Sequence, residues 1–229
     1  MSELSENGVL YLVSTPIGNL EDITLRALRL LKEVDIILAE DTRTTSRLLK
    51  HYKIYNKLKS YHSYNEHRIQ QQIISLLNEG SKIALVTDAG TPGISDPGYL
   101  IVKACLSNDI EIECLPGPTA FVPALIKSGI PTDRFIFEGF LPHKKGRKKR
   151  LENLTHETKT MVFYESPHRL LKTLNDMLSI FGPERQVSVS RELTKKFEET
   201  INGDLSYVVS SFESKKVKGE FVIIIQGNN

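Results

Sequence analysis

The stretch IALVTDAGTPGISDPG, residues 83–98, decides the fold. It begins as an apolar run of β-forming residues, continues as a loop with three glycines and two prolines, and leads into a helical pattern over 99–107. A strand followed by a loop and a helix is the unit from which helix-covered parallel sheets are built. Open sheets of this kind bind ligands beyond the carboxyl ends of their strands. We therefore predict an α/β protein with a ligand site at this loop.

The same alternation of short apolar runs and helical periods extends along the whole chain. In the first half we predict strands at 8–14, 36–39, 83–87 and 111–115, and helices at 24–34, 42–50, 68–77 and 99–107. The first of these helices has Asp22 or Thr24 as its cap. In the second half we predict strands at 135–140, 160–164, 186–190 and 220–226, and helices at 147–154, 168–181 and 205–211.

The length of 229 residues exceeds that of one typical domain, about 100 to 150 residues. A Pro- and Gly-bearing passage follows Pro116 and contains a short helical pattern. We place the boundary within this passage, which gives an N-terminal domain over 1–121 and a C-terminal domain over 122–229.

Composition points to an ordinary globular protein, with 40% apolar and 25% charged residues. No apolar run approaches the roughly 18 to 20 residues that cross a bilayer, and residues 1–7 are polar and acidic, unlike a leader. We expect a cytoplasmic protein without a membrane partner.

Cys105 and Cys114 lack the paired short spacing of zinc sites, so we expect two core thiols and no metal.

The loop at 87–98 contains no lysine or arginine. That absence argues against a phosphate cradle and favours a ligand without phosphates, bound by backbone groups and by side chains such as Asp88 and Ser95. The alternative is a tight turn that only joins strand to helix.

Two further loops, STPIGN at 14–19 and PGPTA at 116–120, also follow predicted strands of the first half directly. All three loops could line one crevice. The first loop lacks the GxGxxG pattern of dinucleotide sites, although Glu40 lies near the position where such sites place an acidic residue. A dinucleotide is therefore a poor fit.

A basic run lies in the second half, where six of the seven residues from 144 to 150 are cationic. The net charge of +2 is too small to indicate nucleic acid by itself, but a local cluster of this kind attracts phosphates. We predict that the run contacts RNA; a solvated helix face is the alternative. Its cations are Lys144, Lys145, Arg147, Lys148, Lys149 and Arg150.

Eight motifs in order carry a resemblance to a known family. They are LYLVSTPIGNLEDITLRAL, AEDTR, LVTDAGTPGISDPG, PGPTA, GFLP with the basic run, FYESPHR, SREL and GEFVIII, and together they cover nearly the whole chain. The chain resembles the tetrapyrrole-methylase-like, or class III, S-adenosylmethionine-dependent methyltransferases. Its PIGN segment departs from the GxGPGD of the tetrapyrrole-modifying branch and is similar to the rRNA-modifying branch.

The resemblance implies two α/β/α domains with S-adenosylmethionine in a cleft between them, in a homodimer. It implies methylation of the 2'-hydroxyl of a cytidine in the decoding region of small-subunit rRNA, as free rRNA or in the 30S subunit. It also implies cofactor contacts at the matching positions, which are Pro16, Gly18, Asp88, Ala89, Gly90, Ser95, Thr119, Ala120, Tyr164 and Arg191.

A ribose hydroxyl is a weak nucleophile, so a base that accepts its proton, or a cation that stabilises the alkoxide, would help. The candidates are Glu40, Asp41, Arg43, Glu165, His168 and Lys195. Each has a structural alternative. The first three could cap and begin a helix, the next two could start another helix, and Lys195 could form a surface ion pair.

Two other functions stay open at this point. The chain could methylate a tetrapyrrole precursor, in which case it would be indifferent to RNA. It could also be a non-catalytic RNA-binding protein that retains the fold, in which case the folded chain would not bind S-adenosylmethionine.

Overall fold

The computed structural model describes residues 8–215 and 217–228. The polar segment 1–7, in which we predicted no leader, lies outside these residues. The chain divides between Thr119 and Ala120 into two compact units, which we call the first unit and the second unit. This division falls two residues before the predicted boundary. Among the residues described, no helix is both long and apolar enough to span a bilayer.

The first unit is built on a parallel sheet of five strands in the order β3-β2-β4-β1-β5. Leu10 is paired with Ile83 on one side and Ile112 on the other, in the interior of the sheet. The strands are β1 (Val9–Leu12), β2 (Ile36–Ala39), β3 (Leu58–Ser60), β4 (Lys82–Val86) and β5 (Glu111–Cys114). The three-residue edge strand β3 was not predicted.

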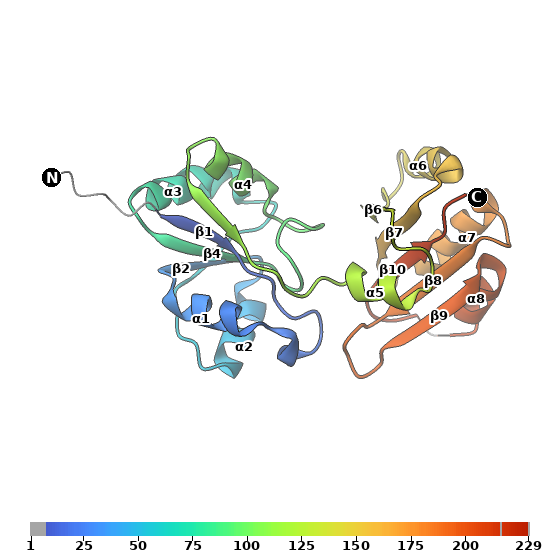
Figure 1. Cartoon of the computed structure of the whole chain (residues 1–229), viewed down its shortest axis with the longest axis horizontal. Helices are drawn as coiled ribbons and strands as arrows, with labels where there is room; N and C mark the ends of the chain where they lie inside the picture. The colour runs from blue at the N-terminus through green and yellow to red at the C-terminus, as the bar shows by residue number, and fades with distance from the viewer. Residues whose placement is uncertain (1–7, 216, 229) are drawn as a thin grey trace. The chain divides into compact units, whose positions relative to one another are not determined.

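Helices cover both faces of this sheet (Figure 1). Leu31 of α1 and Leu48 of α2 belong to one buried cluster, and Ile73 of α3 and Ile101 of α4 belong to another. Of the two predicted caps, Thr24 is correct, because its side chain accepts a hydrogen bond from the Ala27 N–H. The helices are α1 (Leu25–Glu33), α2 (Thr42–His51), α3 (Glu66–Asn78) and α4 (Tyr99–Leu106), with a short 3-10 turn, η1 (Leu20–Asp22).

The strand order places a topological switch point between the adjacent strands β1 and β4. The chain leaves β1 through α1 on one face and leaves β4 through α4 on the opposite face. The loops that follow these two strands therefore diverge, and open α/β sheets bind their ligands in the crevice between such loops.

The second unit contains a mixed sheet in the order β6-β7-β10-β8-β9. Only β6 and β7 pair in parallel, so the expected parallel sheet is wrong for this unit. The cause is β10, which is inserted antiparallel between β7 and β8 (Figure 1). The strands are β6 (Phe135–Phe140), β7 (Thr160–Glu165), β8 (Gln186–Arg191), β9 (Glu199–Asp204) and β10 (Phe221–Ile225). The polar edge strand β9 was not predicted.

The core of the second unit lies between this sheet and three helices. Phe163 of β7, Leu174 of α7 and Phe212 of α8 are buried in one cluster. The strand β10 is buried along its whole length, as expected for the centre of a sheet. The helices are α5 (Phe121–Lys127), α6 (Arg147–Asn153), α7 (Leu170–Phe181) and α8 (Leu205–Glu213), and the 3-10 turn η2 (Leu154–His156) follows α6.

The prediction of two core thiols is half right. Cys105 on α4 is fully buried, and burial raises the pKa of its thiol to about 11. Cys114 is exposed, because it ends β5, which forms an edge of the first sheet.

Candidate functional site

The loops that follow β1 and β4 are joined by a short antiparallel bridge. The Thr15 N–H donates to the Gly90 carbonyl at 2.9 Å, and the Gly90 N–H donates to the Thr15 carbonyl at 3.0 Å. The buried Thr15 hydroxyl also donates to the Thr87 carbonyl at 3.0 Å. The two loops at the switch point are thus fixed to each other by backbone as well as side-chain bonds.

The hydroxyl of Thr91 joins a third loop to these two. Its Oγ1 lies 2.9 Å from Ser14 Oγ and 2.6 Å from Thr119 Oγ1, and it is within 3.0 Å of the Pro118 carbonyl. One side chain thus connects the loops after β1, β4 and β5. The structure brings together all three loops that the sequence placed at strand ends, within the first unit alone.

Close backbone approach explains the glycine that follows Pro116. A Cβ added to Gly117 would lie 2.6 Å from the Cβ of Ser14, closer than real Cβ contacts allow. Gly90 adopts a left-handed backbone with φ of +86°, which side chains with a Cβ rarely adopt. Ser95 adopts φ of +65° in the same loop without being glycine, a mild strain of the kind that clusters at ligand sites.

Carboxylates connect the ends of β2 and β4. The Asp41 N–H donates to Asp88 Oδ1 at 3.1 Å, and the Asp88 N–H approaches Glu40 Oε2 at 3.4 Å. Burial raises the pKa of both Glu40 and Asp88, and the neighbouring carboxylates raise it further. This corner of the first unit is therefore acidic, and a nearby cation would offset the repulsion between its carboxylates. Within residues 8–215 and 217–228, no group of three His, Cys, Asp or Glu side chains is arranged to hold a metal ion.

Asp41 has the structural role that we gave as its alternative. Its Oδ1 accepts from the Arg43 N–H at 2.8 Å as the N-cap of α2, and its carboxylate also accepts from the Arg43 guanidinium. These bonds lower the pKa of Asp41 to about 2. Arg43 is itself exposed and forms an ion pair with Asp41, so the two residues together stabilise the first turn of α2.

The residues implied as cofactor contacts fall in both units. Those of the first unit lie on the three joined loops: Pro16, Gly18, Asp88, Ala89, Gly90, Ser95 and Thr119. Ala120, Tyr164 and Arg191 belong to the second unit. Sequence reasoning did not select Ser14, Thr15 or Gly117. The available signal was the pair of hydroxyl residues directly after β1 and the glycine between two prolines after β5.

Glu165, a predicted catalytic candidate, is enclosed in the second unit. It is 2% exposed and accepts hydrogen bonds from the Ser166 N–H at 2.8 Å, Arg169 Nε at 2.8 Å and the Thr173 hydroxyl at 2.6 Å. A buried carboxylate that is already satisfied by three donors stabilises the fold and cannot readily accept a substrate proton. The prediction of a catalytic Glu165 is therefore corrected to an anchor at the end of β7.

Arg147, a predicted RNA contact, is also buried, at 5% exposure. Its Nε donates to Asp176 at 2.8 Å, and one terminal nitrogen donates to the Thr173 hydroxyl at 2.7 Å. The other terminal nitrogen is 4.0 Å from Glu165 and has no hydrogen-bond partner among the residues that the structure describes. The prediction that it contacts RNA is wrong, because Arg147 shares its helix face with the buried Leu151 and so points inward.

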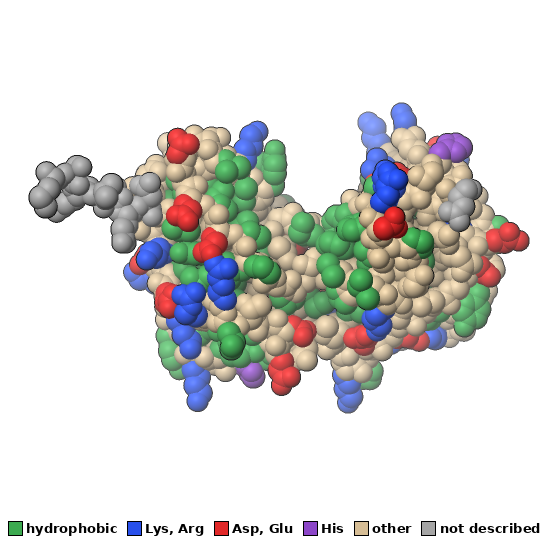
Figure 2. All heavy atoms as spheres, viewed as in Figure 1, with side chains coloured by type: hydrophobic (Ala, Val, Ile, Leu, Met, Phe, Trp, Pro, Cys, Tyr) green, Lys and Arg blue, Asp and Glu red, His purple; other side chains and the backbone are tan. Residues whose placement is uncertain are grey.

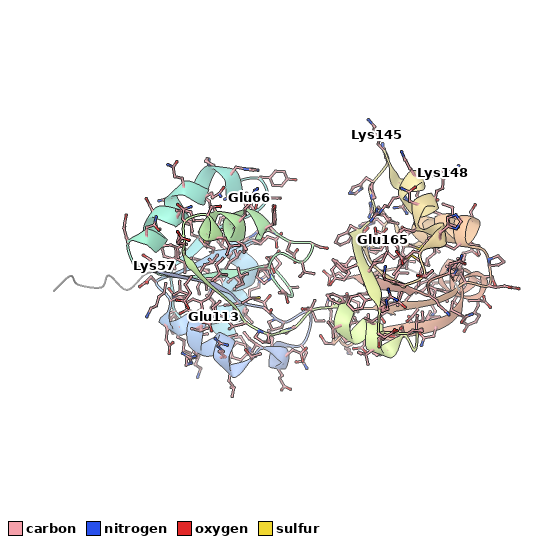
Figure 3. All side chains as sticks on the ribbon, turned by 45° about the horizontal axis from the view of Figure 1, so that its top comes forward. Lys57, Glu66, Glu113, Lys145, Lys148 and Glu165 are labelled. Carbon is pink, nitrogen blue, oxygen red and sulfur yellow. The ribbon has the colours of Figure 1, made fainter. Side chains whose placement is uncertain are left out.

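The remaining cations of the run lie on the surface. Lys144, Lys145, Lys148 and Lys149 are exposed. Figure 2 shows basic side chains gathered over the α6 region, and in Figure 3 Lys145 and Lys148 point away from the body of the second unit. Arg150 is half exposed and held by Glu138. Five of the six predicted cations therefore reach the surface.

Ion pairs also organise the end of β8. Lys195 Nζ lies 2.9 Å from both Glu192 Oε1 and Glu220 Oε2. Burial alone would lower the pKa of Lys195, but the bonds to the two carboxylates outweigh burial and raise it. Arg191 lies 3.6 Å from Glu199, and its Nε is buried without a hydrogen-bond partner within 8–215 and 217–228.

His168 and Tyr164 flank the end of β7. His168 is exposed on the turn before α7. Tyr164 lies in an aromatic cluster, with edge contacts to Phe137 at 5.2 Å and Phe140 at 5.7 Å between ring centroids. Within the YESPHR motif, Tyr164 is therefore packed among other rings, whereas the imidazole of His168 is exposed.

Comparisons with known proteins agree with this architecture. The family of Tetrapyrrole (Corrin/Porphyrin) Methylases matches residues 9–208. Proteins named Ribosomal RNA small subunit methyltransferase I are similar along nearly the whole of this chain. The one from Thermotoga maritima is 50% identical and covers 96% of this chain and 99% of its own. The one from Halalkalibacterium halodurans is 52% identical and covers 97% of this chain and 77% of its own.

Solved structures share the fold at lower identity. Uroporphyrin-III C-methyl transferase from Thermus thermophilus, complexed with S-adenyl homocysteine, is 21% identical with a TM-score of 0.65, covering 95% of this chain and 97% of its own. The methyltransferase CobJ is 18% identical with a TM-score of 0.69, covering 97% and 95%.

Proposed function

Since this chain belongs to the tetrapyrrole (corrin/porphyrin) methylase family, and within it to the group named ribosomal RNA small subunit methyltransferase I, we propose that it transfers methyl groups from S-adenosylmethionine to small-subunit rRNA. The observation that carries this proposal is identity of 47–52% over at least 96% of the chain with relatives of that name. The proposed acceptor is the 2'-hydroxyl of one cytidine in the decoding region, as the motifs imply.

The joined loops of the first unit fit the cofactor chemically. S-adenosylmethionine carries a sulfonium and an ammonium cation but no phosphate, and the loop at 87–98 offers a carboxylate and hydroxyls without any lysine or arginine. The pKa values of Glu40 and Asp88 are raised, so their ionised forms are disfavoured. A cation beside them would favour the ionised forms and would in turn be attracted by their negative charge. We propose that Asp88, Gly90 and Thr119 hold the cofactor, together with Pro16, Gly18, Ala89 and Ser95.

When bound, the cofactor supplies an electrophilic methyl carbon, so the chain's residues contribute mainly alignment and handling of one proton. Asp41, Arg43 and Glu165 are engaged in structural bonds. Glu40, His168 and Lys195 stay as the proposed groups that act on the ribose hydroxyl. A half-buried carboxyl with a raised pKa, as at Glu40, is a stronger base than an exposed one.

The exposed lysines of the basic run support binding to a polyanion. Each phosphate contact displaces condensed counterions, so affinity for RNA should fall steeply with salt. We propose small-subunit rRNA, free or within the 30S subunit, as the partner, together with a homodimeric assembly and a cytoplasmic location.

The experiment is transfer of labelled methyl groups from S-adenosylmethionine to small subunits that lack native methylation, followed by mass mapping. One 2'-O-methylcytidine is the expected product. A parallel reaction offers uroporphyrinogen III to the same enzyme. Label in the tetrapyrrole and none in RNA would contradict the proposal and favour the other branch of the family.

A further inference from the structure

A hollow of about 400 Å³ lies within the second unit, where β6 ends and α6 begins. Its volume falls within the range of small-ligand pockets, about 300–1,000 Å³. All its lining residues come from 138–153, so it is complete within this unit. The side chains that carry chemistry are Glu138, Phe140, Lys149, Arg150 and Asn153.

An exposed aromatic ring forms one part of the wall. Phe140 is 53% exposed, although it ends a strand of the sheet. Its ring makes an edge contact with Tyr164, with 5.7 Å between centroids and 63° between planes. This contact fixes the ring while leaving much of its surface available for stacking.

A fixed guanidinium forms another part of the wall. Arg150 donates from Nε and from a terminal nitrogen to the two oxygens of Glu138, each at 2.6 Å. The Glu138 side chain is only 7% exposed. A guanidinium held by two bonds presents a rigid plane, and such planes stack on nucleobases.

A β-bulge makes this pair possible. The register between β6 and β7 shifts between Phe137 and Gly139, which leaves Glu138 as the extra residue. Bulges redirect side chains and are frequent beside functional sites. Gly139 adopts φ of +61° and accommodates the distortion.

Polar groups complete the lining. Lys149 is exposed, and in the part of the chain that the structure describes no carboxylate pairs with it, whereas Glu152 approaches Lys148 at 3.7 Å. Asn153 contributes an amide that can donate and accept. The buried bonds of Arg147 to Asp176 and Thr173 anchor α6, so these groups keep their places.

We propose that this hollow binds one splayed nucleotide of the RNA substrate. The base stacks on Phe140 and Arg150, Asn153 reads its polar edge, and Lys149 holds a phosphate. A segment of RNA fits better than a free nucleotide because Lys144, Lys145 and Lys148 extend the cationic surface beyond the hollow. The proposal rests on the proposed function and adds a site of recognition to it.

The test is fluorescence anisotropy with a labelled RNA oligonucleotide that spans the mapped methylation site. Phe140→Leu keeps apolar bulk beside Tyr164 but removes the ring, and should weaken binding on the order of tenfold. Phe140→Trp should bind like the unchanged chain. Phe135→Leu is the matched control, a half-exposed ring at the opposite end of β6, and should leave affinity within about twofold.

A second arm replaces single nucleotides of the oligonucleotide with abasic sites. At one position, the abasic site should weaken binding to the unchanged chain by the same factor as Phe140→Leu does. The same abasic site should not weaken binding to the Phe140→Leu variant any further, because both changes remove one stacking contact. Lys149→Ala should reduce the slope of log affinity against log salt by about one, and Lys172→Ala on α7 should not.

Failure of the nucleotide site and failure of the proposed function give different results. If the unchanged chain binds and methylates RNA but Phe140→Leu binds equally well, or every abasic effect adds to that of Phe140→Leu, the hollow is not a nucleotide site. If the unchanged chain neither binds nor methylates RNA, the proposed function fails and the subsite fails with it.

Discussion

The two units use charge in opposite ways at the carboxyl ends of their strands. In the first unit, neutral hydroxyls join the loops, and the acidic groups Glu40 and Asp88 have raised pKa values. In the second unit, Glu165 is enclosed by donors, and the surplus charge is positive and exposed on the basic run. An acidic corner whose long loop lacks lysine and arginine suits a sulfonium ligand, and an excess of lysines suits RNA.

The largest effect should come from breaking the buried network of the second unit. Arg147→Met leaves Asp176 without its donor and removes a bond to Thr173, so the free energy of unfolding should fall by about 3 kcal/mol. Chemical denaturation measures the loss. Lys148→Met, one residue along on the exposed face, should change it by less than about 0.5 kcal/mol. Equal stability of Arg147→Met and the unchanged chain would contradict the buried role.

Removing the exposed cations should leave stability intact and weaken RNA binding. With Lys144, Lys145, Lys148 and Lys149 all changed to Ala, the slope of log affinity against log salt should fall by about 3. Affinity for S-adenosylmethionine, measured by calorimetry, should stay near that of the unchanged chain. Unaltered RNA affinity would remove the basic run from the interface.

Thr91→Val tests the hydroxyl junction of the first unit. The change preserves shape but removes the group that bonds Ser14, Thr119 and Pro118. We expect affinity for S-adenosylmethionine to fall about 30-fold, equivalent to about 2 kcal/mol. Thr44→Val on α2 serves as the control. RNA affinity should not change in either variant, and a cofactor affinity unaffected by Thr91→Val would contradict the junction's role.

The smallest effect concerns Glu40. Because its folded-state pKa is raised, the carboxyl stabilises the fold while protonated, and that contribution is lost as pH rises from 4.5 through the folded pKa. Glu40→Gln should therefore melt slightly higher than the unchanged chain at pH 7, with the difference vanishing below about pH 4.5. Melting curves across this range, without cofactor, measure it. A Gln variant that is less stable at pH 7 would indicate that the carboxylate is favourably paired.

The predictable part of the fold was the part with strong periodicity. The central strands and most helices follow from apolar patterns. The strands β3 and β9 were missed because edge strands carry few apolar residues: LKS and ETINGD resemble loops. The antiparallel pairing of the second sheet was hidden because β7, α7 and β8 do form a parallel crossover. Only long-range pairing places β10 between the two strands.

The site was predictable to the level of loops, but less so for individual side chains. The ends of the predicted strands located the three loops, but no pattern of residues indicated that Thr91 joins them. Arg147 was misassigned within a run of like charges, although Leu151 and Leu154 at helical spacing indicated its inward face. Glu165 could not be assigned without knowing its donors, because a carboxylate at a strand end has the same sequence pattern whether buried or free.

The separate roles of the three joined loops and the basic run are tested most directly by steady-state methyl transfer to small subunits, with the cofactor and the RNA varied in turn. We expect Thr91→Val to raise KM for S-adenosylmethionine and to leave KM for the subunit unchanged, and we expect the four-lysine variant to do the reverse. If the lysine variant impaired use of the cofactor, or Thr91→Val impaired only use of the RNA, the assignment of the three joined loops to the cofactor and of the basic run to RNA would be contradicted.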